Sequence, residues 1–155
     1  MPTYSNTSSL KLESCHKDLQ TIFNYVIRWE DNIIVSGGRT AHEQFNLYKK
    51  GRKLAGDVWI IEDRSKIVTY KDGVFNKSNH QPPDGSALST AVDVMPYHDI
   101  APHIRWKDLE GIQHFAGFVL GVARMLKEYG AIEHTLVWGG GWESFFDAPH
   151  YELKK

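Results

Sequence analysis

The sequence closes with an aspartate and a histidine three positions apart, in Asp147-Ala-Pro-His150. This spacing can place a general base beside a metal ligand, and two further candidate ligands, His80 and Asp93, lie upstream. Two histidines and one carboxylate leave the fourth position of a tetrahedral zinc ion open, as a hydrolytic site requires. We therefore predict that His80, Asp93 and His150 bind one zinc ion and that Asp147 is the general base.

Asp93 is the most informative of these residues taken singly. It stands in the apolar segment Ala91-Val-Asp-Val-Met95, where an unpaired carboxylate is costly and a metal or an arginine would compensate it. His80 has two rivals, His98 and His103, in a loop flanked by prolines. The remaining histidines fall on segments predicted to be helical or exposed and are interpreted as surface residues: His16, His42, His114 and His134.

Asp147 and His150 are expected to converge through a turn, because Pro149 disfavours helical backbone at the residue before it. Arg39, after a Gly-Gly turn, can bind a substrate carboxylate or stabilise an oxyanion, or it can form an ion pair across a helix start. Gln44 can support the same surface or face solvent. The tryptophans at 138 and 142 can wall a cleft or pack in the core.

The composition is that of a folded, nearly neutral chain. The 155 residues are 41% hydrophobic and 24% charged with a net charge of −1, which fits one domain and gives no sign of a surface for nucleic acid. The single cysteine, Cys15, excludes an internal disulfide and is expected to be buried. Without a basic start or a long apolar run, we predict no signal peptide, no membrane insertion and a cytoplasmic location in the producing cell.

Periodicity and turn residues predict the elements of the first half. Apolar residues at steps of three and four indicate helices, and a short apolar run before Gly-Gly indicates a strand. The segment Thr40-Ala-His-Glu43 has the spacing of a capping box. The expected elements are a loose polar lead-in over residues 1–8, one helix from Leu12 to about Trp29, a strand over 33–35 and a helix over 40–50 that stops at Gly51.

The second half is predicted to supply most of a sheet and its longest helix. A hairpin is expected from strands 58–61 and 66–70, and a long loop from the polar residues 76–90. Further expected elements are a strand over 92–95, a helix from the N-cap Asp108 to Tyr129, and strands over 136–138 and 151–153. The metal candidates then lie on loops and strand ends of one α+β domain, residues 1–155, with helices packed against its sheet.

Three blocks carry a family resemblance. They are Ile34-Val-Ser-Gly-Gly-Arg39-Thr-Ala-His-Glu-Gln44-Phe-Asn-Leu-Tyr48, then Ser78-Asn-His80 with Ala91-Val-Asp93-Val-Met-Pro96, and last Trp138-Gly-Gly-Gly-Trp142 with Asp147-Ala-Pro-His150-Tyr-Glu-Leu153. In this order they resemble the VanY-type zinc D-alanyl-D-alanine carboxypeptidases and, more closely, the L-alanyl-D-glutamate endopeptidases found among bacteriophage endolysins. The resemblance covers most of the chain, from roughly Leu12 to Leu153.

The resemblance implies a small α+β domain whose antiparallel sheet carries the zinc, and cleavage of the stem peptide of bacterial peptidoglycan. It makes His80, Asp93 and His150 the zinc ligands and Asp147 the catalytic base. Arg39, a second catalytic candidate, and Ser78 match cleft residues, and we add Gln44 as a substrate-binding candidate beside them. By analogy with the family, the protein is expected to act on the wall after release through a partner such as a holin. We also predict that it is a monomer.

Two departures from the family pattern stand out. The family element S-x-H-x-x-G-x-A-x-D places six residues between histidine and aspartate, whereas twelve separate His80 from Asp93. A longer surface loop is thermodynamically tolerable, so the two ligands can still meet. The closing block of the family reads W-G-G-D-W, and Gly141 replaces that aspartate. Altered specificity or reduced activity is therefore one expectation.

Three functions are weighed. The first is a zinc endopeptidase that cleaves the L-Ala-D-Glu bond. The second is a D,D-carboxypeptidase with the same chemistry, since the cleft loops that set specificity, such as 53–77 and 97–107, do not decide between them. The third is an inactive module that binds the cell wall on the same scaffold, for which the longer loop and Gly141 are the best support.

Overall fold

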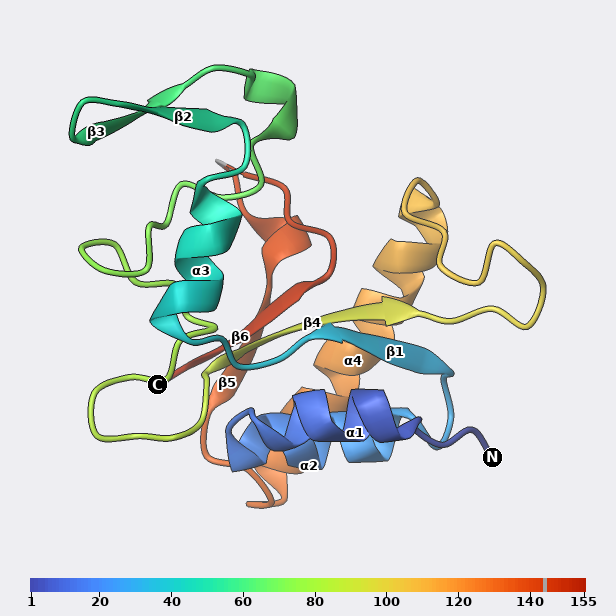
Figure 1. Ribbon diagram of the computed structural model, residues 1–155. Coiled ribbons are helices and arrows are strands. Elements are labelled where there is room, and N and C mark those ends of the chain that lie inside the picture. The colour runs from blue at the N-terminus through green and yellow to red at the C-terminus, as the bar shows by residue number, and fades with distance from the viewer. Residues whose placement is uncertain (144) are drawn as a thin grey trace.

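A four-stranded antiparallel sheet with the strand order β1-β4-β6-β5 organises the chain (Figure 1). This computed structural model describes residues 1–143 and 145–155. The described elements, in chain order, are α1 (Asn6–Glu13), α2 (Lys17–Val26), β1 (Asn32–Ser36), α3 (Ala41–Tyr48), β2 (Arg52–Ala55), β3 (Val58–Ile61), the 3-10 turn η1 (Arg64–Lys66), β4 (Ala91–Pro96), α4 (Leu109–Glu128), β5 (Thr135–Trp138), the 3-10 turn η2 (Gly139–Gly141) and β6 (His150–Lys154).

The sheet has one apolar face and one polar face, because successive side chains of a strand point to opposite sides. Val92 and Val94 of β4 and Tyr151 of β6 join the hydrophobic core, which α2 and α4 complete. The alternate residues Asp93 and His150 therefore face the other way. The expected α+β fold, with helices packed on an antiparallel sheet, is confirmed.

The helix and strand predictions that rest on caps and apolar runs are confirmed. Thr40 and Glu43 form the capping box at the start of α3, and Asp108 caps α4 by accepting a hydrogen bond from the Gly111 N–H. Cys15 is fully buried. None of the described helices is both long and apolar enough to cross a lipid bilayer.

The expected loose lead-in and single first helix are wrong. Residues 6–8 already belong to α1, whose N-cap Ser5 accepts a hydrogen bond from the Ser8 N–H. The chain breaks between α1 and α2, where Cys15 forms a β-bridge with Ser89 and the His16 N–H donates to the Ser89 carbonyl. The bridge between Cys15 and Ser89, which are 74 positions apart (89 − 15), thus interrupts a periodicity that looks continuous locally.

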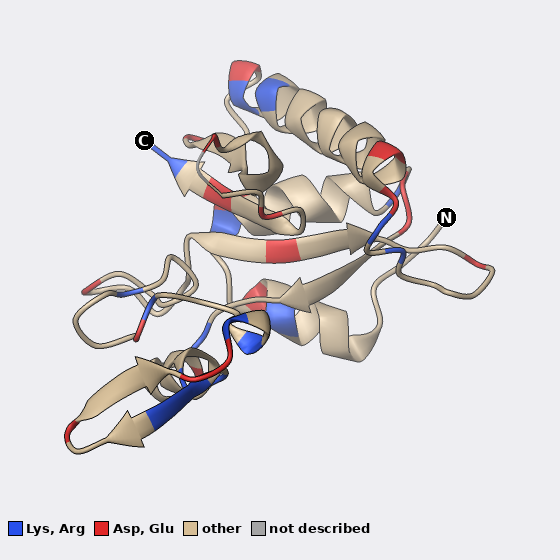
Figure 2. Cartoon of the chain, turned by 90° about the horizontal axis from the view of Figure 1, so that it is seen from above, with Lys and Arg blue, Asp and Glu red and all other residues tan. Residues whose placement is uncertain are grey.

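The hairpin also differs from the prediction. The strand 58–61 pairs with residues 52–55 rather than with 66–70, and the connecting turn contains Gly56 at a φ of +63°. Glycine adopts this left-handed conformation without steric cost, which makes the Gly56-Asp57 pair a hairpin turn. The hairpin projects from the rest of the molecule beyond α3 (Figures 1 and 2).

Candidate metal centre

The three predicted metal ligands meet on the polar face of the sheet. Asp93 and His150 are direct partners in the antiparallel register of β4 and β6, so the pleat places both side chains on the same face. His80 reaches them from the loop 76–90. Asp93 Oδ1 lies 3.1 Å from His80 Nε2 and 3.2 Å from His150 Nδ1, and the two ring nitrogens are 3.3 Å apart.

These three distances fit a tetrahedral ion. With bonds of 2.0–2.1 Å, a tetrahedral zinc ion separates neighbouring ligand atoms by about 3.3 Å. The observed triangle of two nitrogens and one carboxylate oxygen has edges of this length. The donor set and its spacing therefore fit one ion with a remaining open position.

The other nitrogen of each histidine has its own acceptor, which fixes which nitrogen faces the ion. His80 Nδ1 lies 2.8 Å from the Gly37 carbonyl oxygen, so it carries the proton and leaves Nε2 free as a ligand. His150 is arranged the opposite way, because its Nε2 lies 3.0 Å from Glu152 Oε2 and its Nδ1 faces Asp93. Both rings are thus oriented for metal binding by groups outside the ligand set.

Asp93 is held in its charged form. Its Oδ2 accepts a hydrogen bond from the Arg39 guanidinium at 3.0 Å, and its Oδ1 faces both histidines. Burial opposes ionisation, but the contacts with His150, His80 and Arg39 outweigh it and hold the pKa of Asp93 far below its ordinary value. The costly carboxylate predicted from the sequence is therefore compensated by an arginine as well as by the histidine pair.

The same environment acts on His150. Burial disfavours its protonated form, yet the hydrogen bonds with Asp93 and Glu152 raise the pKa of His150 to about 9 in the metal-free protein. A metal ion must displace this proton before Nδ1 can bind it. The affinity for a metal is therefore expected to rise with pH toward this value.

Arg39 orients Asp93 through a set of three contacts. Its Nε donates to Ser36 Oγ at 3.1 Å, one terminal nitrogen donates to Gln44 Oε1 at 3.2 Å, and the other donates to Asp93. A β-bulge between Ile34 and Ser36 brings Ser36 opposite Asp93, and bulges commonly aim side chains at functional sites. The ion pair is thus observed, whereas contact of Arg39 with substrate stays a prediction.

Gln44 requires a correction. It was predicted to bind substrate, but its side chain is fully buried. Its amide accepts from Arg39 and donates to the Lys71 carbonyl and to Thr69 Oγ1, so it has no surface for a ligand. Its position supports the alternative role, in which it holds Arg39 and the segment beyond the hairpin.

Ser78 shapes the turn that presents His80. Its Oγ accepts a hydrogen bond from the His80 N–H, and its carbonyl accepts from the Gln81 N–H. The His80 carbonyl in turn accepts from the Arg39 N–H at 2.7 Å. His80 is therefore fixed despite the long loop to Asp93, and a substrate contact of Ser78 stays a prediction.

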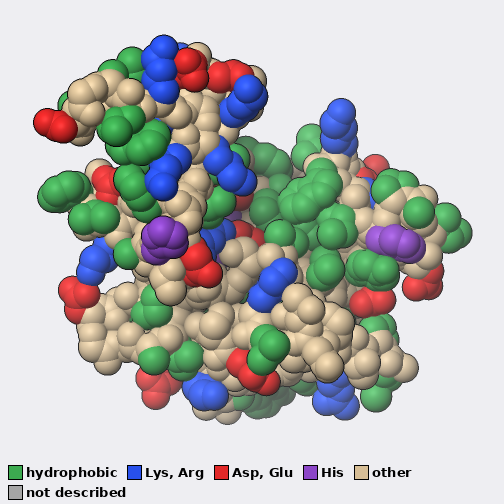
Figure 3. All heavy atoms as spheres, viewed as in Figure 1, with side chains coloured by type: hydrophobic (Ala, Val, Ile, Leu, Met, Phe, Trp, Pro, Cys, Tyr) green, Lys and Arg blue, Asp and Glu red, His purple; other side chains and the backbone are tan. Residues whose placement is uncertain are grey.

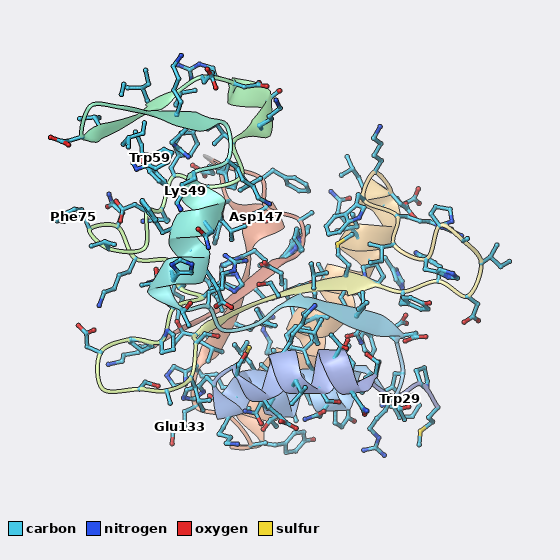
Figure 4. The ribbon with its side chains drawn as sticks, in the orientation of Figure 1. Trp29, Lys49, Trp59, Phe75, Glu133 and Asp147 are labelled. Carbon is cyan, nitrogen blue, oxygen red and sulfur yellow. The ribbon has the colours of Figure 1, made fainter. Side chains whose placement is uncertain are left out.

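Asp147 lies in a turn next to the three candidate ligands, as we predicted from Pro149. Its carbonyl accepts from the His150 N–H, and its own N–H donates to the Gly139 carbonyl. Burial and the negative charge of Asp93 raise the pKa of Asp147, which makes it a better proton acceptor than a solvated aspartate. Figure 4 shows it beside α3, on the side that faces the sheet.

The glycine-rich segment packs directly on this turn. A Cβ at Gly139 would lie 2.7 Å from the Asp147 carbonyl oxygen, so only glycine allows this approach. Trp138 Nε1 donates to the Ala148 carbonyl at 2.7 Å, and the Trp142 ring lies 5.1 Å from the His150 ring. The tryptophans thus position the turn and wall the site, whereas a Cβ at Gly141 would meet open space.

The rival histidines belong to a different place. The His98 N–H donates to the His103 carbonyl, and the His103 ring stacks on Tyr97 within their own loop. Two neighbours of the site were missed by the sequence reasoning, namely Glu152 and Asn79. A signal for Glu152 was available, because an acidic residue two positions after a metal ligand on a strand shares its face.

The molecular surface has a recess beside the lobe that carries α3. Figure 3 shows a hollow between the lobe made by α3 with the hairpin and the side that carries the start of α4. Basic side chains gather on the α3 side, and hydrophobic side chains on the α4 side. A second groove, on the outer surface of α2 and α4, is lined by residues such as Trp29 and Phe118 and by none of the candidate metal ligands.

Comparison with known proteins identifies a curated relative and a solved structure to which this chain is similar. No model of a protein family matches the sequence. The chain is 31% identical over 124 residues to the peptidoglycan L-alanyl-D-glutamate endopeptidase CwlK of Bacillus subtilis (strain 168), across 79% of this chain and 60% of that protein. The matched part thus spans less than two thirds of the relative's length. The fold is similar to the crystal structure of the Serratia marcescens L-Ala D-Glu endopeptidase ChiX, with a TM-score of 0.60, 21% identity, and coverage of 97% of this chain and 89% of that one.

Proposed function

We propose that this chain hydrolyses the L-Ala-D-Glu bond of the stem peptide. The proposal starts from its homology to the peptidoglycan L-alanyl-D-glutamate endopeptidases in the VanY-like peptidase family. The observation that carries the proposal is the triangle of His80, Asp93 and His150 with its tetrahedral spacing. We further propose that the ion is zinc, whose usual ligands are of these types. The bacteriophage origin and release through a holin stay predictions.

When bound, zinc would lower the pKa of water and polarise the scissile carbonyl. The protein supplies the remaining chemistry. Asp147, with its raised pKa, would accept the proton of the attacking water and donate it to the leaving amine of D-Glu. Arg39 keeps Asp93 ionised, so the charge of the ligand set does not change as protons move through Asp147.

We further propose that the substrate binds in this recess, whose two walls would set its direction. Its basic side, formed by α3 and the hairpin, can face the carboxylates of the stem peptide, while its apolar side can face the alanine. A cleft with two walls of different chemistry would bind the peptide in one orientation. This arrangement favours an internal bond whose two sides differ in charge, as the L-Ala-D-Glu bond does.

The test is digestion of purified peptidoglycan by zinc-loaded protein, with the released fragments identified by mass spectrometry. We expect new D-Glu amino termini with matching L-Ala carboxyl termini, and their loss in Asp147→Ala with zinc retained. Release of D-Ala alone would identify a D,D-carboxypeptidase instead. If protein with stoichiometric zinc released no fragments, an inactive wall-binding module would replace the proposed enzyme.

A further inference from the structure

One buried carboxylate joins the two histidine segments of the site. Glu152 is 4% exposed and lies on β6, two residues after His150 and on the same face of the sheet. Its Oε2 accepts a hydrogen bond from Asn79 Nδ2 at 2.6 Å and lies 3.0 Å from His150 Nε2. Asn79 is the residue immediately before His80. A single oxygen atom therefore contacts both segments.

The burial of Glu152 needs a reason, since a carboxylate leaves water only where hydrogen bonds or charges replace its hydration. It does not face the hydrophobic core, which takes up its neighbours Tyr151 and Leu153. Its second oxygen pairs with Lys154, whose side chain is 55% exposed and contacts neither histidine segment. The contacts of Oε2 with His150 and Asn79 lie instead at the rear of the ligand triangle.

We propose that Glu152 is the positioning residue of the metal centre, and that it acts as a clamp between the two histidine ligands. By accepting the Nε2 proton of His150, it would leave Nδ1 as the nitrogen that faces the ion and raise its basicity. By accepting from Asn79, it would fix the turn that presents His80. This inference rests on the metal site in the proposed function and adds a residue outside the ligand set.

The long loop gives the clamp a specific purpose. Twelve residues separate His80 from Asp93, so chain connectivity alone constrains the distance between these ligands only weakly. The hydrogen bond from Asn79 to Glu152 instead ties the His80 segment to β6 across 73 residues of sequence. Asn79 also holds the far end of the loop, because its carbonyl accepts from the Thr90 N–H. The segment before His80 is thereby anchored independently of the loop length.

The test compares zinc affinity, measured by competition with a chromophoric chelator, in wild type, Glu152→Gln, Glu152→Ala and Asn79→Ala. Loss of an outer partner of a ligand histidine weakens metal binding by about 10- to 100-fold, so we expect this loss in Glu152→Ala. Glu152→Gln should lose less, because its amide oxygen still accepts the His150 proton but carries no charge. Asn79→Ala should weaken zinc binding while leaving the His150 contact intact.

Lys154→Ala is the matched control, because it removes another partner of Glu152 without touching either histidine segment. Its zinc affinity should stay within about twofold of wild type. The visible spectrum of the cobalt-substituted protein gives a second readout, since it reports ligand geometry. It should change in Glu152→Gln and stay unchanged in Lys154→Ala.

Wild-type zinc affinity and an unchanged cobalt spectrum in Glu152→Gln and Glu152→Ala would overturn the clamp. If Glu152→Ala does not fold in a thermal melt of the metal-free protein, the nearly isosteric Glu152→Gln decides. A wild-type protein that binds no zinc would remove the metal site and the proposed function together. A wild type that binds zinc and cleaves peptidoglycan, with unaffected variants, would remove only the clamp.

Discussion

Two clusters of two histidines and one aspartate occur in the part of the chain that the structure describes, and their side chains make different contacts. One is His80, Asp93 and His150 on the polar face of the sheet. The other is His16, Asp18 and His134, where the start of α2 meets the segment before β5. The residue types are the same, so the difference lies in what the lone pairs already contact.

In the second cluster, His16 Nδ1 and Asp18 Oδ2 already accept hydrogen bonds from backbone N–H groups. Asp18 Oδ2 accepts from the backbone N–H groups of Glu133 and His134 at 3.0 Å and lies 2.8 Å from His134 Nδ1. His16 Nδ1 accepts from the Asp18 N–H at 3.1 Å and so caps α2. An ion there would have to break these contacts. We therefore interpret the second cluster as a structural connection between α2 and the segment 133–134.

In the first cluster the three candidate ligand atoms converge. His80 Nε2, His150 Nδ1 and Asp93 Oδ1 contact one another, while the other ring nitrogen of each histidine is bonded to Gly37 or Glu152. The comparison teaches that ligand types alone do not identify a metal site. The distinguishing feature is a set of three candidate ligand atoms held at the spacing of the ion, with the other ring nitrogens bonded outside the set.

The largest effect is expected from removing the charge of the first cluster. Asp93→Asn should weaken zinc binding by more than about 100-fold, beyond the loss of an outer partner, because a direct ligand is changed. Cleavage of peptidoglycan should disappear with the metal. Zinc titration followed by the digestion assay measures both, and an Asp93→Asn protein that kept full zinc binding would erase the difference between the clusters.

The second cluster should respond in stability rather than in metal binding. Asp18→Ala leaves two backbone N–H groups and a histidine without their acceptor, which should lower the free energy of unfolding by roughly 2–4 kcal/mol. Urea denaturation measures this loss. Zinc should still bind at one ion per chain, and a reduced stoichiometry would show that Asp18 is a ligand.

The Asp18 contacts also set a pH dependence. Burial opposes its ionisation, but the hydrogen bonds from His134 and Glu133 prevail and lower the pKa of Asp18. Because the folded-state pKa is depressed, this stabilisation is present above the ordinary aspartate pKa of about 4 and is lost as the pH falls below it. The difference in unfolding free energy between wild type and Asp18→Ala should therefore be large at neutral pH and small at low pH. An equal difference in stability at pH 3 and pH 7 would contradict this assignment.

A smaller effect is expected at the arginine of the first cluster. Arg39→Lys keeps the positive charge but cannot reach Ser36, Gln44 and Asp93 together, because an ammonium lacks the planar fork of donors. Zinc affinity should fall by about tenfold, the lower end for loss of a partner that orients a ligand. If zinc affinity is unchanged while KM for peptidoglycan rises, Arg39 binds substrate and does not orient Asp93.

The smallest effect is expected at the position where the closing block departs from the family pattern. Gly141→Asp should fold normally, because a Cβ there meets open space. With the metal centre complete without it, we expect cleavage within a few-fold of wild type and an unchanged zinc affinity. A gain of more than about tenfold in kcat/KM would show that Gly141 limits the enzyme.

The ligand triangle could be predicted because its chemistry is visible locally. Asp93 interrupts an apolar strand, and Pro149 forces the turn between Asp147 and His150. The helices with clear caps and the strands with apolar runs follow from the same local rules. Asp93 and His150 were therefore candidates from their strand and turn context, whereas His80 was preferred over His98 and His103 through the family resemblance. The structure adds the distances between the three candidates.

The remaining features depend on contacts between distant segments. The break between α1 and α2 follows from the bridge of Cys15 to Ser89, and the burial of Gln44 follows from its bonds to Lys71 and Thr69. Neither contact has a local sequence signal. The two histidine clusters make the same point, since only the folded chain shows that the Asp18 oxygen is already occupied.

The most direct measurement is anomalous diffraction at the zinc edge from crystals of the zinc-loaded protein. One peak is predicted, bonded to His80 Nε2, Asp93 Oδ1 and His150 Nδ1 at about 2.0–2.2 Å. It should be absent in Asp93→Asn crystals and unchanged in Asp18→Asn crystals. A peak between His16, Asp18 and His134, or none at the first cluster, would contradict the assignment of the metal centre.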